Sequence, residues 1–100
     1  MKIDHDADHK RFFARLKSGD AYLSYERPRP GVLDLQHTIV PPAEQGRGVG
    51  ESLVRAALGY ARERGERVIP TCPFVGSWLA EHPGEDDVVV PADELADDGR

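Results

Sequence analysis

Residues 44–58 read EQGRGVGESLVRAAL, a glycine-rich turn that runs straight into a helical pattern. From Val49 onward apolar side chains recur at spacings of three and four residues, which predicts an amphipathic helix that ends at Gly65. The first turn of an α-helix carries free N–H groups and the positive end of the helix dipole, so it attracts anions. Glycine at this place lets a bulky phosphate approach the backbone. The stretch therefore suggests a ligand that carries phosphate.

Two common phosphate-binding patterns do not fit these glycines. A P-loop requires G-x-x-x-x-G-K-[ST], whereas residues 46–52 read GRGVGES and contain no lysine. A dinucleotide fingerprint requires G-x-G-x-x-G, and after Gly48 and Gly50 the third glycine is replaced by Leu53. A purely structural interpretation also stays open, in which the glycines only turn the chain after Pro41-Pro42.

The remaining elements follow from the periodicity of apolar residues. Strands are predicted at residues 11–16, 21–26 and 32–40, and the turn-forming residues between them favour an antiparallel meander. After the helix, residues 67–72 predict a further strand and residues 74–79 a short second helix. The order β-β-β-α-β-α predicts a mixed α+β fold, in which a central mixed sheet combines the meander with a β-α-β-α unit.

The composition bounds the class of protein. One hundred residues, 39% of them apolar, make a single domain, and no apolar run reaches the roughly 20 residues that cross a bilayer. The net charge of −5 comes from residues 85–100, which hold seven acidic side chains and one arginine. We expect a domain over residues 1–88 and a solvated acidic tail over residues 89–100, which is a candidate for disorder. Partners of the folded part are then neither nucleic acid nor membrane.

The single cysteine, Cys72, excludes an internal disulfide, and the N-terminus does not read as a signal peptide. Both observations favour a cytoplasmic protein. The segment DHDADH, residues 4–9, matches no established spacing of metal ligands, so we expect no metal site.

Residues 45–50, QGRGVG, have the form [QR]-x-x-G-x-[GA]. With HTIVPP before this loop, and VIPTCPFV and WLAEHP after the helix, the sequence resembles the small single-domain branch of the GCN5-related N-acetyltransferase (GNAT) superfamily. The resemblance covers roughly residues 10–88. It implies a minimal GNAT-like fold and acetyl-CoA as the cofactor. In this superfamily the loop binds the pyrophosphate of acetyl-CoA between a strand and a long helix.

The resemblance assigns binding roles to residues of this chain. Main-chain groups of residues 38–40 would bind the pantetheine amides, and the thioester would lie close to Cys72. Backbone amides of the loop would bind the pyrophosphate, with the Arg47 guanidinium adding a charged contact. The cofactor-binding residues expected on this basis are Thr38, Ile39, Val40, Gln45, Gly46, Arg47, Gly48, Val49 and Gly50.

Three residues are candidates for the proton transfers that amine acetylation requires. Asp34 precedes the loop where many superfamily members carry a carboxylate base. His37 lies on the opposite face of the same strand by strict alternation, although a β-bulge would change which side chain points inward. Cys72 precedes Pro73, a residue favoured at the first helical position, where the helix dipole lowers the pKa of a thiol. Each also has a structural interpretation, Cys72 as a small buried apolar residue and His37 as a strand residue.

The sequence therefore supports two functions. The first is an acetyl-CoA-dependent N-acetyltransferase, monomeric or weakly dimeric, that acts on an exposed primary amine of a peptide, protein or polyamine. The short turns between the first strands leave room for such an open acceptor site. The second is a CoA-binding or acyl-CoA-sensing module without catalysis. It stays open because Phe74 and Trp78 occupy the region where larger superfamily members carry a tyrosine that protonates the CoA thiolate. A structural interaction domain with no affinity for CoA is a third interpretation.

Overall fold

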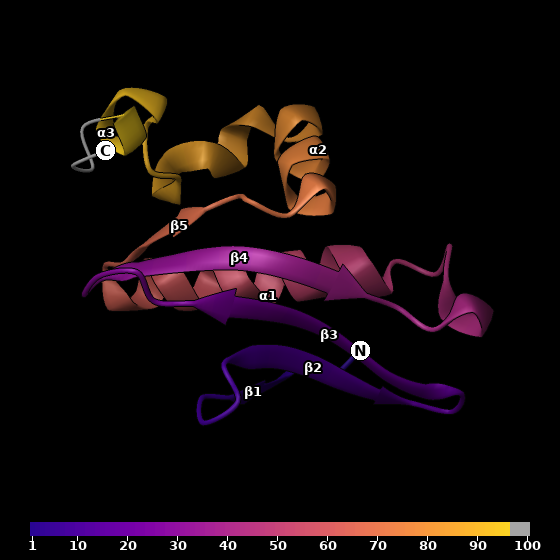
Figure 1. The fold of residues 1–100 in the computed structure, drawn as a ribbon. Coiled ribbons are helices and arrows are strands. Elements are labelled where there is room, and N and C mark those ends of the chain that lie inside the picture. Colours follow the sequence, from indigo (N-terminus) through magenta and orange to yellow (C-terminus); the bar gives the residue numbers. More distant parts are fainter. Residues whose placement is uncertain (97–100) are drawn as a thin grey trace.

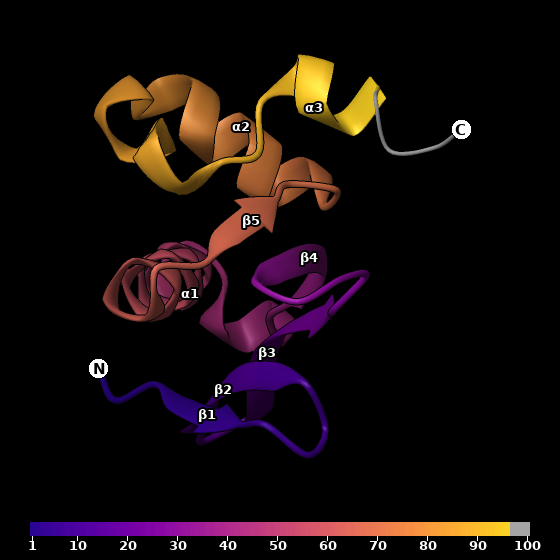
Figure 2. The same ribbon diagram turned by 90° about the vertical axis from the view of Figure 1, so that its left-hand side faces the viewer.

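The computed structural model describes residues 1–96, which form a five-stranded sheet with a long helix against one face (Figures 1 and 2). The strands lie in the spatial order β1-β2-β3-β4-β5. The elements are β1 (Asp4–Asp6), β2 (Arg11–Leu16), β3 (Gly19–Glu26), β4 (Val32–Ile39), the 3-10 helix η1 (Pro42–Glu44), α1 (Val49–Arg64), β5 (Arg67–Ile69), α2 (Pro73–Glu81), the 3-10 helix η2 (Pro83–Val88) and α3 (Ala92–Ala96).

The predicted mixed sheet is confirmed. β1 to β4 pair antiparallel in sequence order, and β5 pairs parallel to β4 after the crossover through α1. β1 was not expected from the sequence, and it adds a short strand at the edge of the meander. His5 of β1 stacks on Phe12 of β2, with ring centroids 4.4 Å apart, and this contact holds the added strand to the sheet.

α1 forms where the sequence predicts it because glycine marks both of its ends. Gly48 and Gly65 adopt left-handed φ values of 79° and 66°, and the Gly65 N–H donates to the carbonyls of Ala61 and Arg62. One face of the helix is buried against the sheet, where Leu23, Leu33 and Leu35 form the other side of the core. The buried helix residues are Val49, Leu53, Val54, Ala57, Leu58 and Ala61.

β5 is shorter than the predicted strand at residues 67–72. Its pairing with β4 ends at Ile69 opposite Asp34, and the next residue, Pro70, has no N–H with which to continue the ladder. The chain then crosses to α2, and within the described residues the last backbone bond between the two segments runs from the Cys72 N–H to the Leu35 carbonyl at 2.8 Å. Beyond that bond β4 and the chain after β5 diverge (Figure 1).

The packed chain continues past residue 88, where the domain was expected to end. The Val90 N–H donates to the Val68 carbonyl at 2.9 Å, and the Val90 side chain is 2% exposed. In α3, Glu94 accepts a hydrogen bond of 2.7 Å from Arg67. The expected end at residue 88 was based on the acidic residues of this segment, and a count of charges does not include apolar residues such as the buried Val90. Residues 97–100, the end of the expected tail, lie outside the described residues.

Candidate functional site

The glycine-rich loop leads into α1 with free backbone amides. Gly46 and Gly48 have φ values of 80° and 79°, a left-handed conformation that other residues rarely adopt. Gly48 is the N-cap and offers no side chain to the helix, and the first intrahelical bond runs from the Ser52 N–H to the Gly48 carbonyl at 3.0 Å. The N–H groups of the first three helical residues therefore have no acceptor within the helix. An anion near the start of α1 would meet these amides and the positive end of the helix dipole.

Gly50 is glycine for a different reason. It has no left-handed φ, but a Cβ atom built on it would lie 2.7 Å from Cζ and 2.9 Å from Cε2 of Phe74. The Phe74 ring thus packs directly on the backbone of the first turn of α1. The motif [QR]-x-x-G-x-[GA] admits glycine or alanine at this position, whereas the ring contact in this chain favours glycine.

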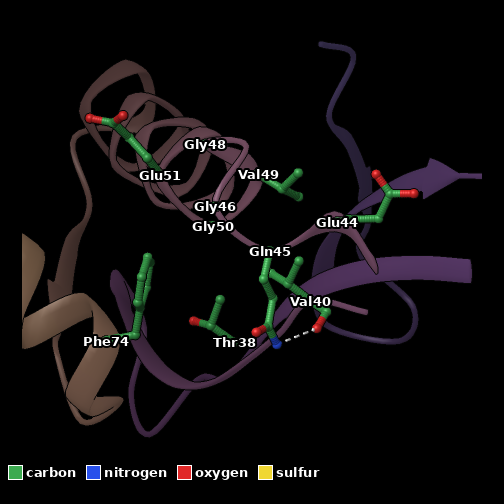
Figure 3. A pocket seen from close by; sticks show the side chains of 10 residues that line it. All are labelled: Thr38, Val40, Glu44, Gln45, Gly46, Gly48, Val49, Gly50, Glu51 and Phe74. Atoms are coloured by element: carbon green, nitrogen blue, oxygen red, sulfur yellow. Dashed lines mark hydrogen bonds between the residues drawn. The ribbon is translucent and has the colours of Figure 1, made fainter. Parts of the chain in front are cut away.

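A pocket of about 460 Å³ opens beside this turn, between α1, the end of β4 and α2 (Figure 3). Seven of the nine residues expected to bind the cofactor line it, and three residues that were not expected to bind the cofactor complete the lining. The expected residues are Thr38, Val40, Gln45, Gly46, Gly48, Val49 and Gly50, and the others are Glu44, Glu51 and Phe74. The side chains of Ile39 and Arg47 are not among the lining residues.

Away from the glycine-rich loop, the pocket is lined by Thr38 at the end of β4 and by Phe74 at the start of α2. The Gln45 amide donates to the Val40 carbonyl at 3.1 Å and closes the connection from β4 to the loop (Figure 3). Thr38 points toward the chain after β5, where its hydroxyl lies 3.3 Å from Cys72 Sγ. The pocket therefore extends from the glycine-rich loop to the neighbourhood of the cysteine.

Cys72 occupies the N-cap position of α2, immediately before Pro73. Its side chain is 5% exposed. Burial opposes ionisation of the thiol, but hydrogen bonds with the Thr38 hydroxyl and with backbone N–H groups in the first turn of α2 outweigh it, and the pKa of the thiol lies below its ordinary value. Of the three catalytic candidates, Cys72 is the one that the structure brings next to the pocket.

The fold and this pocket can be compared with known proteins. The sequence profile of the GCN5-related N-acetyl-transferase family matches residues 11–88. The chain belongs to this family.

Relatives with determined sequences and structures agree with that assignment. The protein NATD1 from Bos taurus is 35% identical over 85 residues, which cover 83% of this chain and 75% of that protein. NATD1 from Homo sapiens is 34% identical with the same coverage of both chains. The NMR solution structure of a GCN5-like protein from Staphylococcus aureus superposes with a TM-score of 0.68 at 22% identity, over 89% of this chain and 87% of that one. This last similarity concerns the fold.

Within this GCN5-related fold, Asp34 and His37 lie on the sheet face turned away from α1. β4 contains a bulge, because Ser24 pairs with His37 and Tyr25 with Leu35, which leaves Gln36 without a cross-strand partner. The bulge reverses the alternation, so that Thr38 faces the α1 side opposite the fully buried Leu23. A bulge was expected to decide which side chain points inward. The side chain that it turns inward is Thr38, and not His37.

Asp34 and His37 also differ in their surroundings. The Asp34 carboxylate accepts hydrogen bonds from the Thr71 hydroxyl and, at 3.3 Å, from the Gln36 amide, so it bridges β4 and the chain after β5. His37 is exposed. Neither residue lines the pocket.

Glu51 brings a negative charge to the pocket, but its carboxylate is occupied. It accepts hydrogen bonds from Trp78 Nε1 at 3.1 Å and from Arg55 at 3.3 Å. The Trp78 bond, followed by the charge of Arg55, holds the pKa of Glu51 below its usual value. Figure 3 shows the carboxylate directed away from the glycine-rich loop. The ion pair with Arg55 offsets part of the negative charge that an anion at the loop would meet.

The N-terminal cluster of histidine and aspartate is held by local contacts. Asp6 accepts hydrogen bonds from the His9 backbone N–H at 3.2 Å and from its ring at 2.8 Å. Within residues 1–96, no three His, Cys, Asp or Glu side chains are arranged to hold a metal ion. None of the helices in the same part of the chain has the length and apolar character of a membrane span.

Proposed function

We propose that the chain is an acetyl-CoA-dependent N-acetyltransferase that acts on an exposed primary amine of a peptide, protein or polyamine. One observation carries the proposal. The pocket joins the uncapped first turn of α1 to the place where β4 and the chain after β5 separate, beside a cysteine of lowered pKa. Membership of the GCN5-related family supports the same function.

The glycine-rich loop has the chemistry needed to bind a pyrophosphate. Left-handed Gly46 and Gly48 direct the chain so that amides of residues 46–50 can point into the pocket mouth, where no side chain caps the helix. The helix dipole adds a positive potential. Arg47 is exposed and forms no ion pair with other residues in the described chain, so its guanidinium can add a charge-assisted hydrogen bond.

The end of β4 has the chemistry needed to bind the amide-containing arm of the cofactor. β4 continues to Ile39 while its pairing with β5 stops at Asp34, so main-chain groups of residues 38–40 are candidates to bind the arm as a strand would. Val40, Val49 and Phe74 provide apolar surface around it. We assign Thr38, Ile39 and Val40 to this interaction.

Acetyl-CoA supplies the acetyl group as a thioester. The protein must then accept the proton that the attacking amine loses. We assign this role first to Cys72, because hydrogen bonds from Thr38 and the first turn of α2 stabilise its thiolate next to the pocket. Asp34 is the second candidate, since it lies at the separation of the strands on the opposite face, from which an acceptor can approach. His37 lies further along the same face.

Release of free CoA tests this function directly. Acetyl-CoA is incubated with peptides carrying a free lysine, with a protein N-terminus and with polyamines, and the thiol released is measured with each. We expect release that requires both the protein and an amine. Cys72→Ala should lower kcat while acetyl-CoA still binds, and Asp34→Asn tests the second base. Full turnover in Cys72→Ala would remove the thiol from the mechanism.

A CoA-binding or acyl-CoA-sensing module is the alternative. The location of Asp34 and His37 away from the pocket favours it, because a binding module has no need of a base on the α1 side. It predicts saturable binding of acetyl-CoA without thiol release for every acceptor. Calorimetry and the release assay, performed on the same preparation, separate the two functions.

A further inference from the structure

Phe74 is a large apolar side chain that remains in contact with solvent. It stands in the first turn of α2 and is 44% exposed, although the rest of the apolar face of α2 is buried. Its ring packs on Gly50, leaves no room for a Cβ there, and lines the pocket together with Thr38 (Figure 3). Exposing an aromatic ring costs free energy that burial would recover. A ligand in the pocket would bury this ring.

The ring is not needed to anchor α2. The Trp78 indole donates to Glu51 at 3.1 Å and stacks on His82 with ring centroids 4.0 Å apart. Val75 is 0% exposed and Leu79 is 8% exposed, so the helix is already held to the core along its whole length. The close contact between Phe74 and Gly50 therefore calls for an explanation other than helix packing.

The position of the ring relates it to one part of the pocket. Phe74 contacts α1 at Gly50, two residues after the N-cap, and lies across the pocket from Thr38 and Val40. The part of the pocket next to Thr38 is therefore lined by an aromatic ring from α2 and by the end of β4.

We propose that Phe74 is a specificity-determining residue, whose ring packs against the pantetheine arm and so selects ligands that carry this arm over ligands that carry the phosphates alone. Gly50 is glycine in order to make room for that ring. The inference rests on the proposed function, because it takes acetyl-CoA as the ligand. The geometry assigns the loop to the phosphates and the Phe74 ring to the methylene and methyl groups of the arm.

The test compares two ligands by isothermal titration calorimetry. Acetyl-CoA carries phosphates and pantetheine, whereas adenosine 3′-phosphate 5′-diphosphate carries the same phosphates, including the pyrophosphate, and no pantetheine. For Phe74→Ala we expect about a tenfold weaker Kd for acetyl-CoA, which corresponds to about 1.4 kcal/mol, and an unchanged Kd for adenosine 3′-phosphate 5′-diphosphate. Phe13→Ala is the matched control: Phe13 is a partly buried aromatic residue on β2 that does not line the pocket, and its substitution should change neither Kd.

Gly50→Ala tests the contact itself. The added methyl group should displace the ring and weaken acetyl-CoA binding in the wild-type background, but have no further effect in Phe74→Ala. An equal loss in both backgrounds would show that Gly50 serves the ligand and not the ring. Thermal unfolding of each variant without ligand shows whether it is folded.

The outcomes separate this inference from the proposed function. If wild-type protein binds acetyl-CoA and Phe74→Ala binds it equally well, the role of Phe74 is wrong and the proposed function stands. An equal loss of both ligands in Phe74→Ala would also contradict the inference, because the ring would then act through the fold of the loop. If the wild-type protein binds neither ligand, the proposed function itself fails.

Discussion

Substitution of Gly48 by glutamate separates the two roles that we give to this residue. Gly48 has a φ of 79°, and nothing lies within 4 Å of a Cβ built on it, so a side chain meets no steric clash. The left-handed backbone alone costs a non-glycine residue roughly 1–2 kcal/mol. In a domain of this size each kcal/mol shifts the unfolding midpoint by about 4–8 °C. We therefore expect Gly48→Glu without ligand to unfold about 4–16 °C below the wild type and to remain folded at room temperature.

The second role becomes visible when acetyl-CoA is added. At a hundred times its Kd the ligand stabilises the wild type by about 2.7 kcal/mol, which is a rise of about 10–20 °C. In Gly48→Glu the new carboxylate lies beside the free amides and repels phosphate, so no rise is expected. Gly48→Ala shares the backbone strain but carries no charge, and it should retain part of the rise. Differential scanning fluorimetry of the three proteins, with and without ligand, measures each quantity.

Gly59→Ala is the matched control for this experiment. Gly59 lies within α1, has no left-handed φ, and has nothing within 4 Å of an added Cβ. Alanine there should stabilise the helix by up to about 1 kcal/mol and leave the rise with acetyl-CoA unchanged. A full ligand-induced rise in Gly48→Glu would refute our account of the loop as the phosphate site. A wild-type protein that shows no rise would refute the proposed function.

Three further measurements test other parts of the structure. Thr38→Val removes a hydrogen bond to the Cys72 thiol, so the pKa of the thiol, followed by the ultraviolet absorbance of the thiolate, should rise from its lowered value. Because folding lowers that pKa, the wild-type thiol stabilises the fold above the pKa of an unfolded cysteine, and this stabilisation is lost as the pH falls through the folded pKa. An unchanged titration midpoint of the thiol in the variant would exclude Thr38 as a cause. Val90→Ala deletes two buried methyl groups and should cost about 2 kcal/mol in urea denaturation; a cost near zero would show that the segment after residue 88 lies outside the cooperative fold. Trp78→Phe keeps an aromatic ring but loses the bond to Glu51, which should raise the pKa of that carboxyl from its lowered value, as NMR titration can determine; an unchanged pKa would exclude the indole as its cause.

Local sequence was sufficient to predict the main elements of this fold, α1 and the strands β2, β3 and β4. The helical periodicity after Gly48 and the glycine at its other end bounded α1, since positive φ at a helix terminus is a property of a single residue. Alternating apolar residues predicted β2, β3 and β4, and the turn-forming residues between them predicted their antiparallel order. The glycine-rich loop could be predicted at the N-terminus of α1 because residues adjacent in the chain form both.

Features that depend on contacts between distant residues were decided by the tertiary structure. The bulge at Gln36 arises from the pairing of β4 with β3, and it moved Thr38 to the α1 side and left His37 exposed on the other. No periodicity in the sequence marks that bulge, because strict alternation and a single inserted residue look alike until the partner strand is known. β1 is three residues long and its pattern carries no strand signal of its own.

The reason for each glycine shows the same division. Gly46 and Gly48 are glycine because their own backbone angles have positive φ, which the sequence pattern already indicates. Gly50 is in contact with the Phe74 ring of α2, and only the packing of α2 beside α1 brings these two residues together. Backbone preference is local and can be predicted from the chain, whereas the fit of one side chain against another depends on where the whole fold positions them.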